Sequence, residues 1–75
     1  MEIEICTIDL SKGNLDNEYT FYESGRIKHF YDRNAFKLNI ESWLSASQIS
    51  EEIRTILLDK CPIDSKEKVN QILHQ

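Results

Sequence analysis

Two runs of aromatic and β-branched residues flank Ser24-Gly25, and no other feature of the sequence constrains the fold as strongly. Such runs around a glycine-containing turn are typical of a β-hairpin, which we predict over residues 18–32. A two-residue loop would mix apolar and charged side chains on both faces of this hairpin. A three-residue loop, with Gly25 in the left-handed bulge position, separates them, so we predict that register.

The predicted register divides the hairpin into two faces. It pairs Phe21 with Ile27 and Tyr19 with His29 on one largely apolar face. Phe30 is the aromatic side chain that this register leaves on the opposite, mainly polar face. The other members of the polar face are Glu18, Thr20, Tyr22, Arg26 and Lys28.

Residues 2–10 predict a first strand, because apolar and acidic residues alternate at its start with the period of a half-exposed strand. The alternation changes phase before Ile8. We therefore expect either a bulge near Cys6–Thr7 or a strand that is covered on both faces.

After the hairpin, the period of the apolar residues changes to that of a helix. Residues 35–38 fit a short further strand or a linker, and Asn39 can cap a short helical turn. Two C-terminal helices are predicted over about residues 46–60 and 65–74, since each has an apolar stripe and a capping box. The sequence thus predicts a single α+β domain over residues 1–75. Its antiparallel sheet has three strands, with a fourth as an alternative, and the two helices follow it and pack on one face.

The residue types that carry catalysis or bind metals form no recognisable pattern. No two of Cys6, Cys61, His29 and His74 have the spacing of roughly two to five residues that places two zinc ligands on one loop. Cys61 falls on an apolar helical stripe, which indicates a core thiol rather than a nucleophile. We predict that the protein is not an enzyme and has neither a cofactor nor a metal site.

The composition predicts the cellular compartment. Secreted domains of this size usually carry more than the two cysteines present here. No run approaches the roughly 20 apolar residues of a membrane span, and the N-terminus lacks the pattern of a secretory signal. We therefore expect a cytoplasmic protein with unpaired thiols and no membrane contact.

The net charge of −4 is distributed unevenly along the chain. Residues 1–23 carry −5, residues 24–40 carry +3 and residues 41–75 carry −2, which sum to −4. Basic side chains interleaved with aromatic ones, as over residues 22–37, are typical of binding surfaces. This segment supplies five candidate partner-binding residues: Tyr22, Arg26, Lys28, Phe30 and Arg33.

The acidic excess would accelerate encounter with a basic partner. We therefore predict a small acidic protein-binding module of the inhibitor, immunity or anti-defence type, which occludes a larger, basic partner such as a nucleic-acid-handling enzyme. One alternative is a module that contacts nucleic acid through residues 22–37, and another is a self-associating structural protein, such as a homodimer. The acidic candidates for the interface are Glu2, Glu4, Glu51, Glu52 and Asp59.

Overall fold

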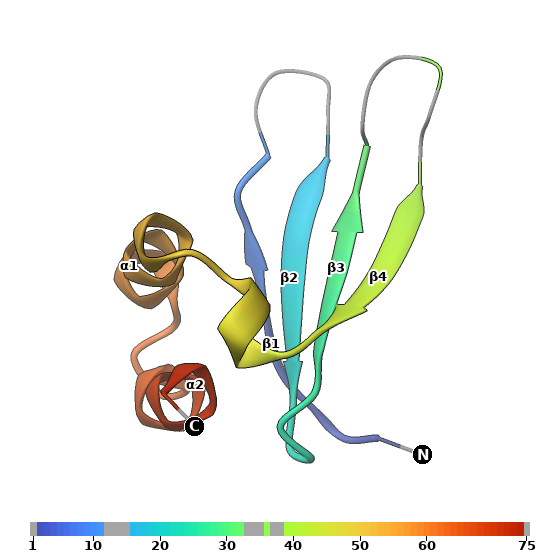
Figure 1. The fold of residues 1–75 in the computed structure, drawn as a ribbon. Coiled ribbons are helices and arrows are strands. Elements are labelled where there is room, and N and C mark those ends of the chain that lie inside the picture. The colour runs from blue at the N-terminus through green and yellow to red at the C-terminus, as the bar shows by residue number, and fades with distance from the viewer. Residues whose placement is uncertain (1, 12–15, 33–35, 37–38, 75) are drawn as a thin grey trace.

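Four antiparallel strands form one sheet in the order β1-β2-β3-β4, in a computed structural model that describes residues 2–11, 16–32, 36 and 39–74. Two helices follow the sheet and lie on one of its faces (Figure 1), which confirms the predicted α+β arrangement with its fourth strand. The strands are β1 (Glu4–Asp9), β2 (Asn17–Tyr22), β3 (Ile27–Tyr31) and β4 (Ile40–Leu44). A short 3-10 helix, η1 (Ala46–Gln48), precedes the two helices α1 (Glu51–Lys60) and α2 (Lys66–Leu73).

The predicted hairpin register is confirmed. Phe21 pairs with Ile27, and the backbone N–H of Tyr22 donates to the carbonyl oxygen of Arg26 at 3.1 Å. Gly25 adopts a φ of 92°, which is the left-handed region where a residue without Cβ is favoured. The turn therefore has the three-residue geometry that the sorting of side chains requires.

The phase change in the first strand corresponds to a bulge, which is one of the two predicted alternatives, but the bulge lies before Cys6–Thr7. The register between β1 and β2 shifts between Glu4 and Cys6, so Ile5 is the additional residue. Beyond this point Cys6 and Ile8 are buried among the core residues, and Thr7 faces the other way. One inserted residue thus explains both parities of the sequence pattern.

The fourth strand corrects the helical turn that we predicted after Asn39. Asn39 has a φ of 56°, which does not fit the extended backbone of a helix cap, and β4 pairs with β3 along its whole length. Ile40 and Leu44 alternate with exposed residues, which is the period of a strand. Of residues 35–38, the structure describes only Phe36, which lies in a turn.

The first predicted helix, over about residues 46–60, is divided into two elements. Ser45 precedes η1, and its backbone N–H donates to Gln48 Oε1 at 2.8 Å. Ile49 is then extended, with φ −99° and ψ 125°, and its side chain is buried in the core. Ser50 caps α1 by accepting a hydrogen bond from a first-turn backbone N–H at 3.3 Å. A second capping serine therefore starts a new helix.

The start of α2 also differs from the prediction. The capping box that predicts this helix consists of Asp64 and Glu67, but Ser65 occupies the N-cap position, and its side chain makes no capping hydrogen bond. The preceding turn is already closed by a backbone hydrogen bond from Ser65 to Pro62 at 2.9 Å, which leads the chain into the helix. The predicted apolar stripe of α2 is confirmed, with Val69, Ile72 and Leu73 all buried.

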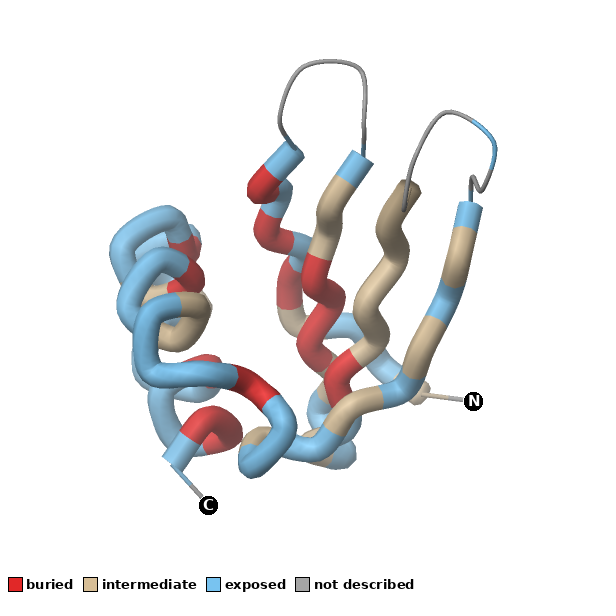
Figure 2. The backbone as a smooth tube through the Cα atoms, turned by 45° about the horizontal axis from the view of Figure 1, so that its top comes forward, coloured by how far each residue is buried: buried red, intermediate tan, exposed pale blue. Residues whose placement is uncertain are grey.

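The core lies between the helices and the first part of the sheet. Phe21 and Ile27 are 0% exposed, and Leu57 of α1 and Val69 of α2 are equally buried in the same cluster. Figure 2 shows that burial declines across the sheet from β1 and β2 toward β4. The helix-facing residues of β4 are only half-buried, so the helices cover one side of this face more completely than the other.

Three aromatic rings stack on the helix-facing side of β2 and β3. The His29 ring lies between Tyr19 and Tyr31, with ring centroids 4.2 and 4.3 Å apart. His29 Nε2 is 2.6 Å from Asn17 Oδ1, which fits a neutral imidazole that donates from Nε2. Burial lowers the pKa of His29 below its ordinary value, because the charged form loses hydration there.

The lowered pKa of His29 predicts a loss of stability in mild acid. The stabilising effect of neutral His29 is complete above its unfolded pKa of about 6.5 and declines as the pH falls through the lower folded pKa. Between about pH 7.5 and pH 5, we expect the urea midpoint to fall in the wild type and to fall less in His29→Phe. Asp9 and Asp32 also have lowered pKa values, but their effect appears only in stronger acid. His74→Gln is the control, and an unchanged pH slope in His29→Phe would contradict this assignment.

Candidate interaction surface

The face of the sheet opposite the helices carries side chains from all four strands, and no described element packs on it (Figure 1). We call it the open face. Directly paired residues of antiparallel strands share a face, so the strand register determines its membership. Its residues are Glu4, Thr7, Asp9, Glu18, Thr20, Tyr22, Arg26, Lys28, Phe30, Glu41 and Trp43.

An aromatic and cationic cluster occupies the end of the open face next to the hairpin turn. The Arg26 guanidinium carbon lies 3.9 Å from the ring centroid of Trp43, and the Tyr22 ring is 5.5 Å from Trp43. Arg26 Nη1 also forms an ion pair with Glu2 Oε2 at 3.2 Å, while Ser24 donates a hydrogen bond to the same carboxylate. Trp43 remains 47% exposed. The cluster is therefore held in place and accessible.

Lys28 extends this cluster along β3. It is paired with Trp43 across the β3–β4 ladder, and its Nζ lies 6.0 Å from the indole centroid. The neighbouring Tyr22 hydroxyl raises the pKa of Lys28 above its ordinary value, chiefly through a hydrogen bond. The lysine therefore stays protonated at neutral pH, and the cluster holds two cations beside two aromatic rings.

The other end of the open face is acidic. Asp9 lies directly opposite Glu18, which lies opposite Phe30, and Phe30 lies opposite Glu41. Like charges in directly opposed positions destabilise a sheet. Phe30, the aromatic residue that the sequence left on the polar face, is half-buried between carboxylates. A cationic group of a partner would relieve the repulsion in this row.

The structure gathers part of the predicted site and separates the rest. Tyr22, Arg26, Lys28 and Phe30 share the open face, where Glu4 joins them and Glu2 pairs with Arg26. The remaining acidic candidates lie on α1, with Glu51 and Glu52 in its first turn and Asp59 near its end. Arg33 lies outside the described residues.

Trp43 is the member of the cluster that the sequence prediction missed. The helical turn that the sequence predicts after Asn39 includes Trp43 and would keep it out of the sheet. The alternation of Ile40, Ser42 and Leu44 with Glu41 and Trp43 was the signal for a strand, and it places the indole on the same face as the hairpin's aromatic residues.

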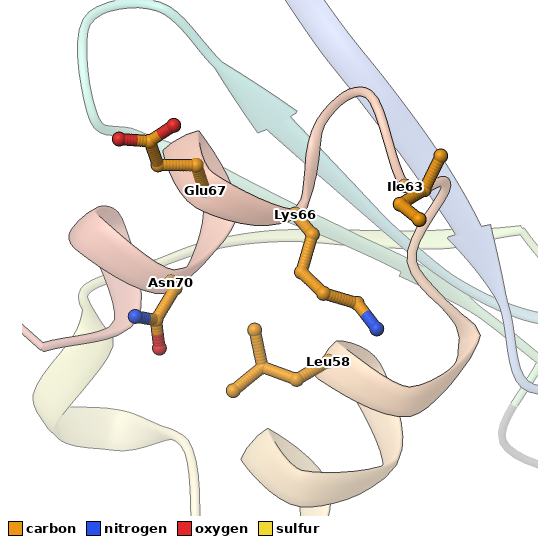
Figure 3. Close-up of a pocket in the computed structure, with 5 residues that line it drawn as sticks. All are labelled: Leu58, Ile63, Lys66, Glu67 and Asn70. Atoms are coloured by element: carbon orange, nitrogen blue, oxygen red, sulfur yellow. The ribbon is translucent and has the colours of Figure 1, made fainter.

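A separate hollow of about 420 Å³ lies between the two helices (Figure 3). Leu58 comes from α1, Ile63 from the connecting turn, and the remaining lining residues from α2. The described lining includes one lysine and one carboxylate but neither a histidine nor a cysteine. The residues shown are Leu58, Ile63, Lys66, Glu67 and Asn70.

The two thiols belong to the core. Cys6 and Cys61 are unpaired and buried, and burial is the main cause that raises the pKa of Cys6 to about 11. A thiol with so high a pKa is protonated at neutral pH and is a poor nucleophile. Across the described residues, no three histidine, cysteine or acidic side chains come close enough together to hold a metal ion.

Within the described ranges, neither helix has the length and apolar character needed to cross a membrane. Comparisons with protein-family models, with curated proteins and with solved structures find no match to this chain.

The contact between Arg26 and Trp43 predicts a measurable coupling. We expect a double-mutant cycle with Arg26→Ala and Trp43→Leu to give a favourable coupling free energy of ~0.5–1 kcal/mol in urea unfolding, as for other partly exposed cation–π pairs. Lys60→Ala, at the exposed end of α1, serves as the control partner for Trp43→Leu. A coupling as small as that of the control pair would contradict the stacked geometry.

Proposed function

We propose that this chain is a non-enzymatic protein-binding module that occludes a basic protein partner with its open face. The observation that carries the proposal is the exposed Arg26–Trp43–Tyr22 cluster next to the acidic row of Asp9, Glu18 and Glu41. Tryptophan, tyrosine and arginine are the residues that most often dominate the energetics of protein interfaces. The acidic row supplies the charge that complements a basic surface.

The charge of the open face favours a basic protein over a nucleic acid. Four carboxylates are on this face, those of Glu4, Asp9, Glu18 and Glu41. Glu2 neutralises Arg26, so among the described residues of the open face Lys28 is the cation that forms no ion pair. Nucleic-acid affinity depends on multiple phosphate contacts by cations. The same carboxylates that would repel phosphates would attract lysine and arginine side chains of a protein.

The arrangement supports an occluding role more readily than a catalytic one. The open face presents rings, hydroxyls and charges, and none of its described members is a histidine or a cysteine. A partner whose nucleic-acid channel is lined with cations would find on this face both counter-charges and an aromatic anchor. Binding there would block access to the channel, as expected of an inhibitor or immunity-type protein.

Three baits of the same length test the proposal by affinity capture from native lysate. The first is the wild type, and the second carries Glu18→Lys and Glu41→Lys on the open face. The third carries Glu51→Lys and Glu52→Lys on α1, which changes the net charge by the same amount at a different surface. We expect one basic protein to be captured by the wild type and the α1 variant and lost by the open-face variant.

Two results would contradict the proposal. Capture that survives the open-face substitutions but is lost with the α1 substitutions would move the interface to the start of α1. Binding of labelled single-stranded DNA or RNA at about 50 mM salt, weakening steeply as salt rises, would favour the nucleic-acid alternative. Circular dichroism spectra that match the wild type establish that each bait is folded.

A further inference from the structure

The two edges of the sheet differ in how well they are protected from pairing with another strand. The edge strand β1 carries a bulge between Glu4 and Cys6, which disrupts the regular ladder. The edge strand β4 pairs with β3 along all five of its residues without a register shift. It contains neither proline nor lysine, the residues that commonly block edge pairing.

The free side of β4 is open to backbone hydrogen bonds. In the described part of the chain, β3 is its single strand neighbour, and no other described backbone group bonds to residues 40–44. Every second N–H and C=O of a strand points to each side, so the outer groups of β4 form a regular row. Burial is also incomplete here, because Ile40, Ser42 and Leu44 on the helix-facing side are half-buried.

We propose that β4 pairs antiparallel with β4 of a second copy of this chain, about a two-fold axis at Ser42. In this register Ser42 faces Ser42 of the second copy, Ile40 faces Leu44, and Glu41 faces Trp43. The four strands of each copy then form one continuous eight-stranded sheet, with both pairs of helices on the same side. This inference does not depend on the proposed function.

The side chains of β4 select this register over its neighbours. An axis at Glu41 would place two carboxylates directly opposite each other, which is destabilising. An axis at Trp43 would pair only residues 42–44 within the strands. The axis at Ser42 pairs all five residues, joins apolar with apolar on the helix-facing side, and opposes no like charges.

Charge complementarity on the open face supports the same pairing. Arg26 lies 3.9 Å from the indole centroid of Trp43 within one copy. The proposed register brings Glu41 of the second copy opposite Trp43, so a carboxylate meets the end of the open face that holds Arg26 and Lys28. Directly opposed side chains in antiparallel strands have Cβ atoms about 4.5–5.5 Å apart, so this carboxylate lies next to the indole on which Arg26 stacks. The symmetry repeats the contact on the other side of the axis.

Molar mass as a function of concentration tests the proposal. By light scattering or sedimentation equilibrium from about 10 μM to about 1 mM, we expect the mass to rise from 8.8 kDa toward twice that value. Ser42→Lys places two cations at the axis and should leave a monomer throughout this range. Ser47→Lys, the same change on exposed η1, should associate like the wild type. Association that Ser42→Lys leaves unchanged would overturn the proposal, and so would a monomeric wild type at the highest concentration.

Disulfide trapping tests the register without relying on a loss of association. Oxidised glutathione accepts two electrons and two protons from each pair of thiols, so Ser42→Cys should form a disulfide-linked dimer at the axis. Glu41→Cys should not, because its two copies would be more than the ~7 Å apart that a disulfide can span. The native thiols are buried in both variants. Equal trapping by the two variants, or none by Ser42→Cys, would contradict the register.

Discussion

The burial of Phe21 and Ile27 beneath the helices determines which way every other strand residue faces. Both side chains are 0% exposed, and they are paired with each other across β2 and β3. A slip of one residue would move each of them to the opposite face of the sheet. Because this pair must remain in the core, Tyr22 and Lys28, which have the other parity, are directed to the open face.

The limited area of the two helices explains why the remaining surfaces are available for contacts. The helices α1 and α2 cover the β1 and β2 side of the sheet (Figure 2), and they contribute Leu57 and Leu73 to the buried core. An ion pair from Lys68 to Glu23 at 2.8 Å joins α2 to the hairpin turn. The β4 side receives less cover, so its helix-facing residues stay half-buried. The proposed partner surface and the proposed self-pairing edge both follow from covering a four-stranded sheet with two short helices.

The sequence was sufficient to predict the hairpin, because the turn at Gly25 and the burial of the apolar face require the same register. Gly25 permitted the turn, and only one register separated apolar from polar side chains, so Tyr22, Arg26, Lys28 and Phe30 were assigned to one face correctly. Their role in binding a partner remains a proposal. The capping serine that divides the first helix, Ser50, was hidden because Ser45 also fits a helix start.

Residues 40–44 show why the fourth strand could not be assigned with the same success. Ile40, Trp43 and Leu44 have the spacing of a helical face, while Ile40, Ser42 and Leu44 have the spacing of a strand. In so short a segment the choice depends on pairing with β3, which no local pattern reveals. That ambiguity concealed Trp43, the residue on which Arg26 stacks. The acidic residues of α1 were predicted as candidates from charge alone, and the fold places them away from the open face.

The most direct test of this account is the access of a neutral, soluble paramagnetic probe to the side chains of the sheet, measured by NMR relaxation. We expect stronger relaxation of the Trp43 and Tyr22 rings than of the Phe21 and Ile27 side chains, which are buried beneath the helices. Equal access at Tyr22 and Phe21, or protection of Trp43 with exposure of Ile27, would contradict it.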